Sequence, residues 1–236
     1  MKTMMLFNLT KAAMEHLFPD SVAKQQEDII QQRRGENIVL YDRDSKQKDT
    51  VDFVFHLHAI KVKQFYCVVA IEKETRWVHI IHHVKKGDVR EFTRRFNERL
   101  VNGVANMIMH VKPNSIALLD MTVGNYTTAN QEMLFVHKSD KSCNTHISQI
   151  VWIYRNVIDE HGFPGNELDA MYFDMEQNAF IRKTKQSKDY FYPAEAMLEK
   201  FLRSYTAMTE KEIQLAVQGN RKGWIISGAK DECNMH

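Results

Sequence analysis

The sequence predicts an α+β fold, in which a mainly antiparallel sheet packs against helices and a helical C-terminal portion follows. Three observations predict it. Residues 52–60 alternate apolar and polar side chains, as a half-buried strand does. Two β-rich runs, 65–71 and 76–84, follow with only a short polar connection between them, which is typical of a hairpin. Beyond residue 145, apolar residues recur mostly at helical spacing.

The N-terminal part begins with a short helix. Apolar residues recur at helical spacing from Ala13 to Phe18, Thr10 is a suitable N-cap, and Pro19 prevents continuation. From Val22 to Asp49 the composition is polar. This segment is expected to form a surface helix, a mobile loop and one short strand at 38–41.

Asp88 is expected to open a helix after the predicted strands. Asp88 and Glu91 have the spacing of a capping box, and apolar residues from Val89 to Leu100 form one stripe. The other side carries mostly arginine. We interpret those charges as a solvated face and not as a phosphate-binding surface.

The rest of the chain is predicted to hold two strands and several helices. The strands are 116–121 and 132–137, with a turn at 124–128 between them. An amphipathic helix then runs from about Ile147 to Gly162, which suits a helix C-terminus. Further helices are expected at 168–174, at 193–205 with Pro193 at its start, and at 209–217 with a Thr209/Glu212 capping box.

Composition excludes several classes of protein. The 236 residues are 44% hydrophobic and 26% charged, which is ordinary for a globular chain. We expect one domain over 1–226 and a flexible tail over 227–236. The longest apolar run is 65–71, far below the roughly 20 residues that cross a bilayer, so no membrane partner is expected. The N-terminus lacks the features of an export signal, and the cytoplasm is the expected location.

Cysteine, glycine and charge content narrow the chemistry. Three widely spaced cysteines exclude a disulfide framework and any Cys-x-x-Cys metal knuckle. Nucleotide-binding glycine motifs are absent, and a net charge of +2 gives no general attraction to nucleic acid. No cofactor is therefore predicted.

Histidines in the predicted sheet are the first candidate site. His56 and His58 lie two residues apart on one strand, and His79 lies on a later strand. Such a set is suited to zinc or another transition metal, or to acid–base catalysis. The simpler interpretation is that His56 and His58 occupy the water-facing side of a one-sided sheet.

The block from Lys138 to Thr145 is the second candidate site. It joins a β-rich run to a helix, whose first N–H groups suit an anion flanked by Lys138 and Lys141. Asp140 and Ser142 are then first-turn or capping residues. The alternative is a helix start satisfied by its own side chains. Cys143 could also act as a nucleophile activated by the helix start, with His146 three residues later as its base. No third group that would orient the histidine is evident in the sequence.

The segment 179–192 is the third candidate site because it interleaves cations with aromatic residues. Proteins that bind single-stranded nucleic acid use this combination for phosphate contact and base stacking. An exposed linker before a buried aromatic cluster has the same appearance. The candidate nucleic-acid contacts are Arg182, Lys183, Lys185 and Lys188.

Several short motifs also occur in a characteristic order. They are Thr10-Lys11 after a strand, His58-Ala59, the hairpin from Ile71 to Trp77, Lys85-Lys86-Gly87-Asp88, the block from Lys138 to Ser142, and Tyr190 to Glu195. Over about Met5 to Leu202, this order resembles a family of small uncharacterised bacterial proteins known only as a domain of unknown function. The resemblance implies one unbroken α+β domain and an accessory role in bacterial and mobile-element contexts. It transfers no reaction.

The chain departs from the family in the second candidate site. The family pattern there is Lys-Thr-x-x-Arg-Ser followed shortly by Gly, whereas Ser139 and Lys141 replace the Thr and Arg, and Thr145 stands near the Gly position. Lysine supplies a point charge in place of the arginine fork, which weakens bidentate recognition of an anion.

These observations predict a non-enzymatic binding or interaction module, and they lean against an enzyme. Its partner would be another protein, a small ligand or a second copy of the chain. One alternative is a metal-dependent or acid–base enzyme that uses the strand histidines. A second alternative is a single-stranded nucleic-acid-binding protein.

Overall fold

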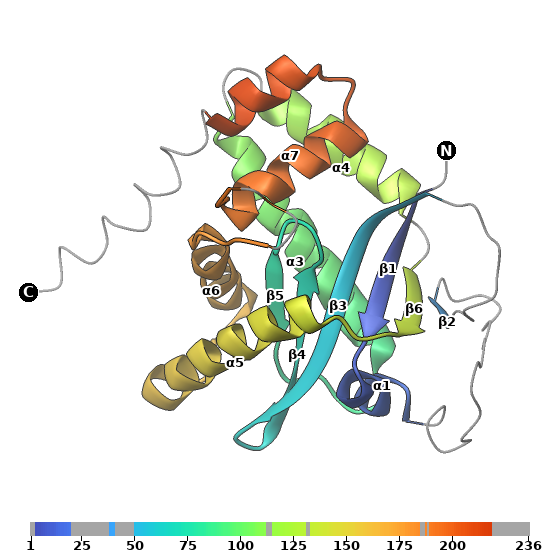
Figure 1. Cartoon of the computed structure of the whole chain (residues 1–236), viewed down its shortest axis with the longest axis vertical. Coiled ribbons are helices and arrows are strands. Elements are labelled where there is room, and N and C mark those ends of the chain that lie inside the picture. The colour runs from blue at the N-terminus through green and yellow to red at the C-terminus, as the bar shows by residue number, and fades with distance from the viewer. Residues whose placement is uncertain are drawn as a thin grey trace, which may run out of the picture.

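The computed structural model describes residues 3–19, 38–40, 50–111, 115–130, 133–184, 187 and 189–218. A six-stranded sheet in the order β2-β6-β1-β3-β4-β5 lies at its centre (Figure 1). The strands are β1 (Thr3–Leu9), β2 (Ile38–Leu40), β3 (Thr50–Val62), β4 (Phe65–Glu72), β5 (Val78–Ile81) and β6 (Met133–His137). The helices are α1 (Lys11–Leu17), α3 (Val89–Met109), α4 (Ser115–Ala129), α5 (Lys141–His161), α6 (Glu167–Ala179) and α7 (Pro193–Tyr205), and 210–218 is also helical.

The sheet is mixed, so the prediction of a mainly antiparallel sheet is wrong. β3, β4 and β5 form the expected antiparallel unit. β1, however, pairs in parallel with β3 and β6, and β6 pairs in parallel with β2. Hairpins leave a local signal in the sequence because their strands are joined by short turns. Parallel pairing joins distant segments and leaves no such signal.

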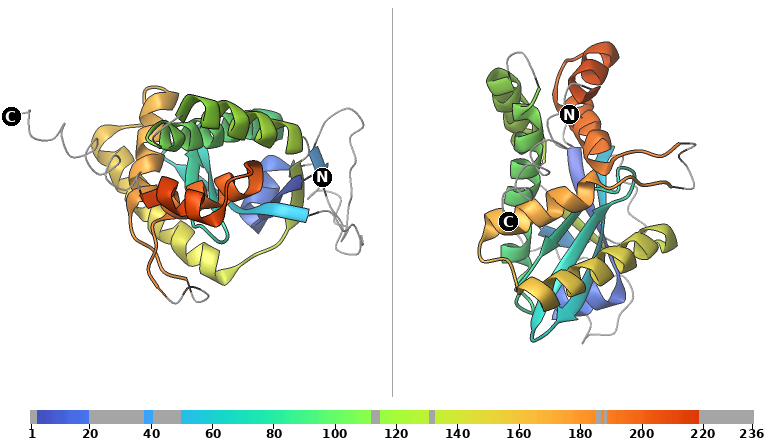
Figure 2. Two further views of the ribbon diagram at one scale, coloured as in Figure 1. Left: turned by 90° about the horizontal axis from the view of Figure 1, so that it is seen from above. Right: turned by 90° about the vertical axis from the view of Figure 1, so that its left-hand side faces the viewer.

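Helices cover both faces of the sheet. α1, α3 and α7 share one hydrophobic core with one set of strand residues, and α5 forms a second core on the other face of β3, β4 and β5. Figure 1 shows α5 crossing in front of these strands and α3 lying behind them. The two perpendicular views in Figure 2 show the same layers. The predicted one-sided sheet is therefore wrong, and His56 is buried, with 2% of its surface exposed.

The region 116–128 is a helix, where a strand and a turn were predicted. α4 contains both stretches and packs against α3 and α7. Threonine hydroxyls at 122, 127 and 128 bond to the carbonyl four residues earlier. Tyr126 is buried, and its ring packs beside that of Phe201. Tertiary packing here outweighs the low helix propensity of the β-branched residues.

Most predicted helix ends are confirmed. The side chains of Thr10 and Asp88 cap α1 and α3, and Gly162 ends α5 with a φ of 81°. Pro193 lies in the first turn of α7, and Thr209 forms the predicted capping box with Glu212. Among the described residues, no helix is both long and apolar enough to cross a membrane. The predicted tail 227–236, and most of 22–49, lie outside the described residues.

Gly103 allows α3 to pack closely on the sheet, which leads to a prediction. A Cβ at Gly103 would lie 2.9 Å from Cζ2 of the fully buried Trp77 ring. We expect Gly103→Ala to lower the free energy of unfolding by about 1–3 kcal/mol, because the core is overpacked. Gly124→Ala in α4, with nothing within 4 Å of the added Cβ, should raise it by up to about 1 kcal/mol. Urea denaturation measures both, and stabilisation by both substitutions would contradict this account of Gly103.

Candidate functional site

β1 and β6 are neighbouring parallel strands, so their carboxyl ends lie side by side at the same end of the sheet. Leu9 pairs with His137, and Asn8 pairs with His56 of β3. Only a few residues after His137 the chain enters α5, whose N-terminus therefore lies beside these strand ends. Open sheets with parallel strands commonly bind ligands at such an edge. We call the group Asn8, His56, Arg76, Asp140, Ser142 and Cys143 the α5 N-terminal site.

Three metal-ligating side chains meet in this site. One ligand atom each from His56, Asp140 and Cys143 lies within 4.8 Å of the other two. His56 and Cys143 are buried, and Asp140 is partly buried. Imidazole, carboxylate and thiolate together are ligands that zinc and neighbouring transition metals accept, and three protein ligands leave one coordination position open.

His56 is held by its neighbour on β1. Its Nε2 lies 3.2 Å from Nδ2 of Asn8, whose Oδ1 is buried without a partner. Turning the Asn8 amide over, which exchanges two atoms of similar size, lets Oδ1 accept the Nε2–H of His56. The Nδ1 lone pair of His56 is then available to a metal. Burial lowers the pKa of His56 to about 4, so the ring is neutral at pH 7.

Asp140 is the N-cap of α5. Its Oδ1 accepts the N–H of Ser142 at 2.8 Å and that of Cys143 at 3.0 Å, and Oδ2 makes neither of these bonds. Burial alone would raise the pKa of Asp140. The N–H of Cys143 and the charges of neighbouring groups outweigh it, so the pKa lies below its ordinary value. The carboxylate is thus ionised at neutral pH and can bind a cation.

Arg76 joins the sheet to the first turn of α5. Its Nη1 donates to Sγ of Cys143 at 2.7 Å, and its Nη2 donates to Oγ of Ser142 at 2.9 Å. Burial raises the pKa of the Cys143 thiol to about 11, while the charge of Arg76 lowers it. A bound metal would displace the thiol proton, and the Arg76 contact would then stabilise the thiolate.

The predicted histidine set does not converge. His56 and His58 do share a strand face, and Nδ1 of His58 lies 3.0 Å from Oγ1 of Thr10. His79 belongs instead with Trp77, on the opposite face of the sheet, where it contacts α3 and α6. Because side chains alternate along each strand, the histidine pattern alone does not show which strand faces coincide.

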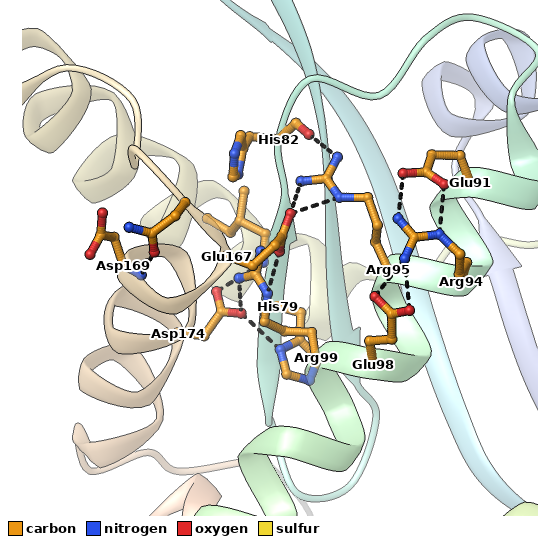
Figure 3. Close-up of polar contacts among 12 residues, drawn as sticks. His79, His82, Glu91, Arg94, Arg95, Glu98, Arg99, Glu167, Asp169 and Asp174 are labelled. Carbon is orange, nitrogen blue, oxygen red and sulfur yellow. Dashed lines mark hydrogen bonds and ion pairs between the residues drawn. The ribbon is translucent and has the colours of Figure 1, made fainter.

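His79 belongs to a buried polar network, most of which Figure 3 shows. The Trp77 indole N–H donates to Nε2 of His79 at 2.7 Å, so the His79 proton is on Nδ1 and is donated to Asp174 at 2.8 Å. Asp174 also accepts a bond from Arg99 at 2.8 Å. Burial lowers the pKa of His79, which keeps the ring neutral, and its nitrogens are both occupied. This histidine is bound into the core and is not free to act as a metal ligand.

The same network corrects the interpretation of the α3 charges. Arg95 and Arg99 are buried and both donate to Glu167 of α6, whereas Arg94 is exposed between Glu91 and Glu98. Glu167 and Asp174 lie on a helix far along the chain, so sequence spacing gives no sign of this pairing. Only the Arg94 side of α3 is the solvated face that the sequence predicts.

The other candidate residues are dispersed. Lys138 and Lys141 are exposed, and Asp140 already accepts the first N–H groups of α5 that were expected to hold an anion. Arg182 is partly buried, and Lys183 lies 5.0 Å from the centre of the Tyr190 ring. Lys185 and Lys188 lie outside the described residues.

A family model matches residues 7–196, which is most of the chain and includes the whole α5 N-terminal site. The protein belongs to the family described as Domain of unknown function (DUF6933). This confirms the resemblance to an uncharacterised family. No curated protein and no solved structure matches the chain. The bacterial origin and the mobile-element context stay predictions.

The buried network predicts a large effect at Asp174. Asp174→Ala removes the buried acceptor of Arg99 and of the Nδ1–H of His79 and leaves Arg99 paired only with the more exposed Glu167, so we expect the free energy of unfolding to fall by about 3–5 kcal/mol. Glu98→Gln removes an exposed partner of Arg94 and should change it by less than about 1 kcal/mol. Chemical denaturation of the two variants makes the comparison, and equal losses would show that the network does not stabilise the fold.

The buried histidines predict sensitivity to acid. Burial and then the charge of Arg95 lower the pKa of His82 from 6.5 to about 4. Between these values the unfolded chain binds more protons than the folded chain, so the free energy of unfolding should decrease as the pH falls from 6.5 to about 4. Urea midpoints measured across this range test it. His82→Gln should reduce the pH dependence without abolishing it, because the pKa values of His56 and His146 are also lowered to about 4. An unchanged slope in His82→Gln would contradict this account of His82.

Proposed function

We propose that this protein is a binding module for a transition-metal ion, zinc being the best fit, held by His56, Asp140 and Cys143. The observation that carries the proposal is the convergence of their three ligand atoms within 4.8 Å. The three residues come from a strand, a helix cap and the first turn of a helix, all at the edge where β1 and β6 end.

Charge balance supports a divalent cation in this site. The Asp140 carboxylate and the Cys143 thiolate together carry two negative charges, and His56 contributes a neutral ligand. Without a metal, the Cys143 thiol keeps its proton because it is buried. The Cys143 thiol therefore becomes negatively charged only when a metal binds and displaces its proton. The two negative ligands then favour a cation over an anion at this position.

This proposal unites two sites that the sequence presented separately. His56 came from the strand-histidine hypothesis, and Asp140 came from the ligand-binding hypothesis. The proposal keeps the non-enzymatic binding role, and it replaces His58 and His79 by ligands from α5. The nucleic-acid alternative has weaker support, because Arg182 is partly buried and the Lys183 ammonium already lies over the Tyr190 ring.

Cobalt substitution tests the proposal. The protein stripped of metal and titrated with Co²⁺ should develop a sulfur-to-cobalt charge-transfer band with about one equivalent bound. Cys143→Ser should abolish the band. His56→Ala removes a ligand and should weaken cobalt binding by at least about 10–100-fold, the loss that removal of a residue supporting a ligand causes. Asn8→Ala, which removes an outer-shell partner of His56, should weaken cobalt binding by about 10–100-fold.

The matched control is Cys67→Ala. Cys67 is the other buried free cysteine of the described residues; it pairs with Ile60, four residues along β3 from His56, and is not one of the converging ligands. This variant should bind cobalt with an unchanged band. A band that persists in Cys143→Ser, or that disappears equally in Cys67→Ala, would overturn the assignment of Cys143 as a ligand.

A further inference from the structure

Two buried nitrogens beside the proposed metal site lack hydrogen-bond partners. They are Nε of Arg76 and Nδ1 of His146. Arg76 is buried, with 5% of its surface exposed. Buried polar groups in native proteins are nearly always paired, so unpaired ones that gather in one place indicate a missing acceptor.

The fold brings these two residues to the same part of α5. His146 follows Ser142 by four residues, so the two side chains lie one turn apart on one side of the helix. Arg76 reaches this side because its Nη2 bonds to Oγ of Ser142. Arg76 also has a φ of 60°, an uncommon conformation for a residue with a side chain. Such strained residues are found disproportionately at binding sites.

A second arginine, Arg182, contributes positive charge at His146 from another part of the chain. Arg182 is fixed by two backbone hydrogen bonds with Phe191, of 2.8 and 2.9 Å. Its side chain is partly buried and makes no hydrogen bond to the described residues. Burial and then the charges of Arg76 and Arg182 lower the pKa of His146 to about 4. The surroundings of His146 are thus rich in donors and positive charge.

We propose that Arg76, His146 and Arg182 form a subsite for a small oxyanion, such as the phosphate group of a ligand. Arginine forks and a neutral imidazole N–H suit the oxygens of phosphate. The subsite deepens the proposed function and rests on it. Arg76 also bonds to the proposed ligand Cys143, so the subsite adjoins the metal site and gives the ligand of this module its chemical class.

Inorganic phosphate is the probe for this subsite. Protein treated with chelator to remove metal should bind phosphate in a calorimetric titration, in a buffer whose ionic strength is held constant with KCl. Arg182→Gln should lower the affinity by about tenfold or more, since one charge-assisted hydrogen bond contributes about 1.5–3 kcal/mol. His146→Gln should lower it as well.

Lys183→Gln is the matched control. Lys183 is the adjacent cation, exposed and stacked on Tyr190, so its removal changes the net charge by the same amount without touching the subsite. It should leave phosphate binding unchanged. Equal losses in Arg182→Gln and Lys183→Gln would show a response to net charge alone and would overturn the proposal, as would absence of phosphate binding to the unsubstituted protein.

The two proposals fail separately. Cys143→Ser should lose the cobalt band and keep phosphate binding, because Arg76 retains its bond to Ser142. Arg182→Gln should lose phosphate binding and keep the cobalt band. Phosphate binding without a cobalt band would overturn the metal site alone, and a cobalt band without phosphate binding would overturn the oxyanion subsite alone.

Discussion

The parallel pairing of β1 with β3 on one side and β6 on the other is the constraint on which the site depends. It places Asn8 beside His56 and makes β6 end where β1 ends. The chain then has only a few residues in which to enter α5, so the cap residue Asp140 and the first turn of that helix must lie against the same strand edge. A ligand set from three elements is the direct result of this register.

Local chemistry made much of the fold predictable, and distant pairing did not. Thr10 and Asp88 could be identified as caps because an N-cap side chain bonds to a backbone N–H only two or three residues later. The β3–β4–β5 hairpins were predictable for the same reason of proximity. The first part of α4, residues 116–121, was predicted as a strand because a short apolar run fits a strand and a helix segment equally well, and packing of Tyr126 against α7 decides for the helix.

The site divides in the same way. His56 was a candidate from the sequence because it lies on a histidine-rich strand. Asp140 and Cys143 were candidates because they lie at a predicted helix start. The sequence could not bring them together, since a strand and a later helix meet only through the sheet order. Arg76 gave no signal at all: it follows a hairpin turn, and nothing near it in sequence shows that its guanidinium ends on α5.

Two groups of buried polar residues behave in opposite ways, and the difference separates stability from binding. In the network of His79, Asp174 and Arg99, both ring nitrogens of His79, Oδ2 of Asp174 and Nη1 of Arg99 have partners, as a structural core requires. Around the first turns of α5, Nε of Arg76 and Nδ1 of His146 lack a partner, and Oδ1 of Asn8 gains one only when its amide is turned toward His56. The other such atoms among the described residues occur singly in His82, Asn130, Tyr154 and Gln177. Unsatisfied groups cost free energy, so their concentration at one strand edge argues that this edge is completed by something the protein binds.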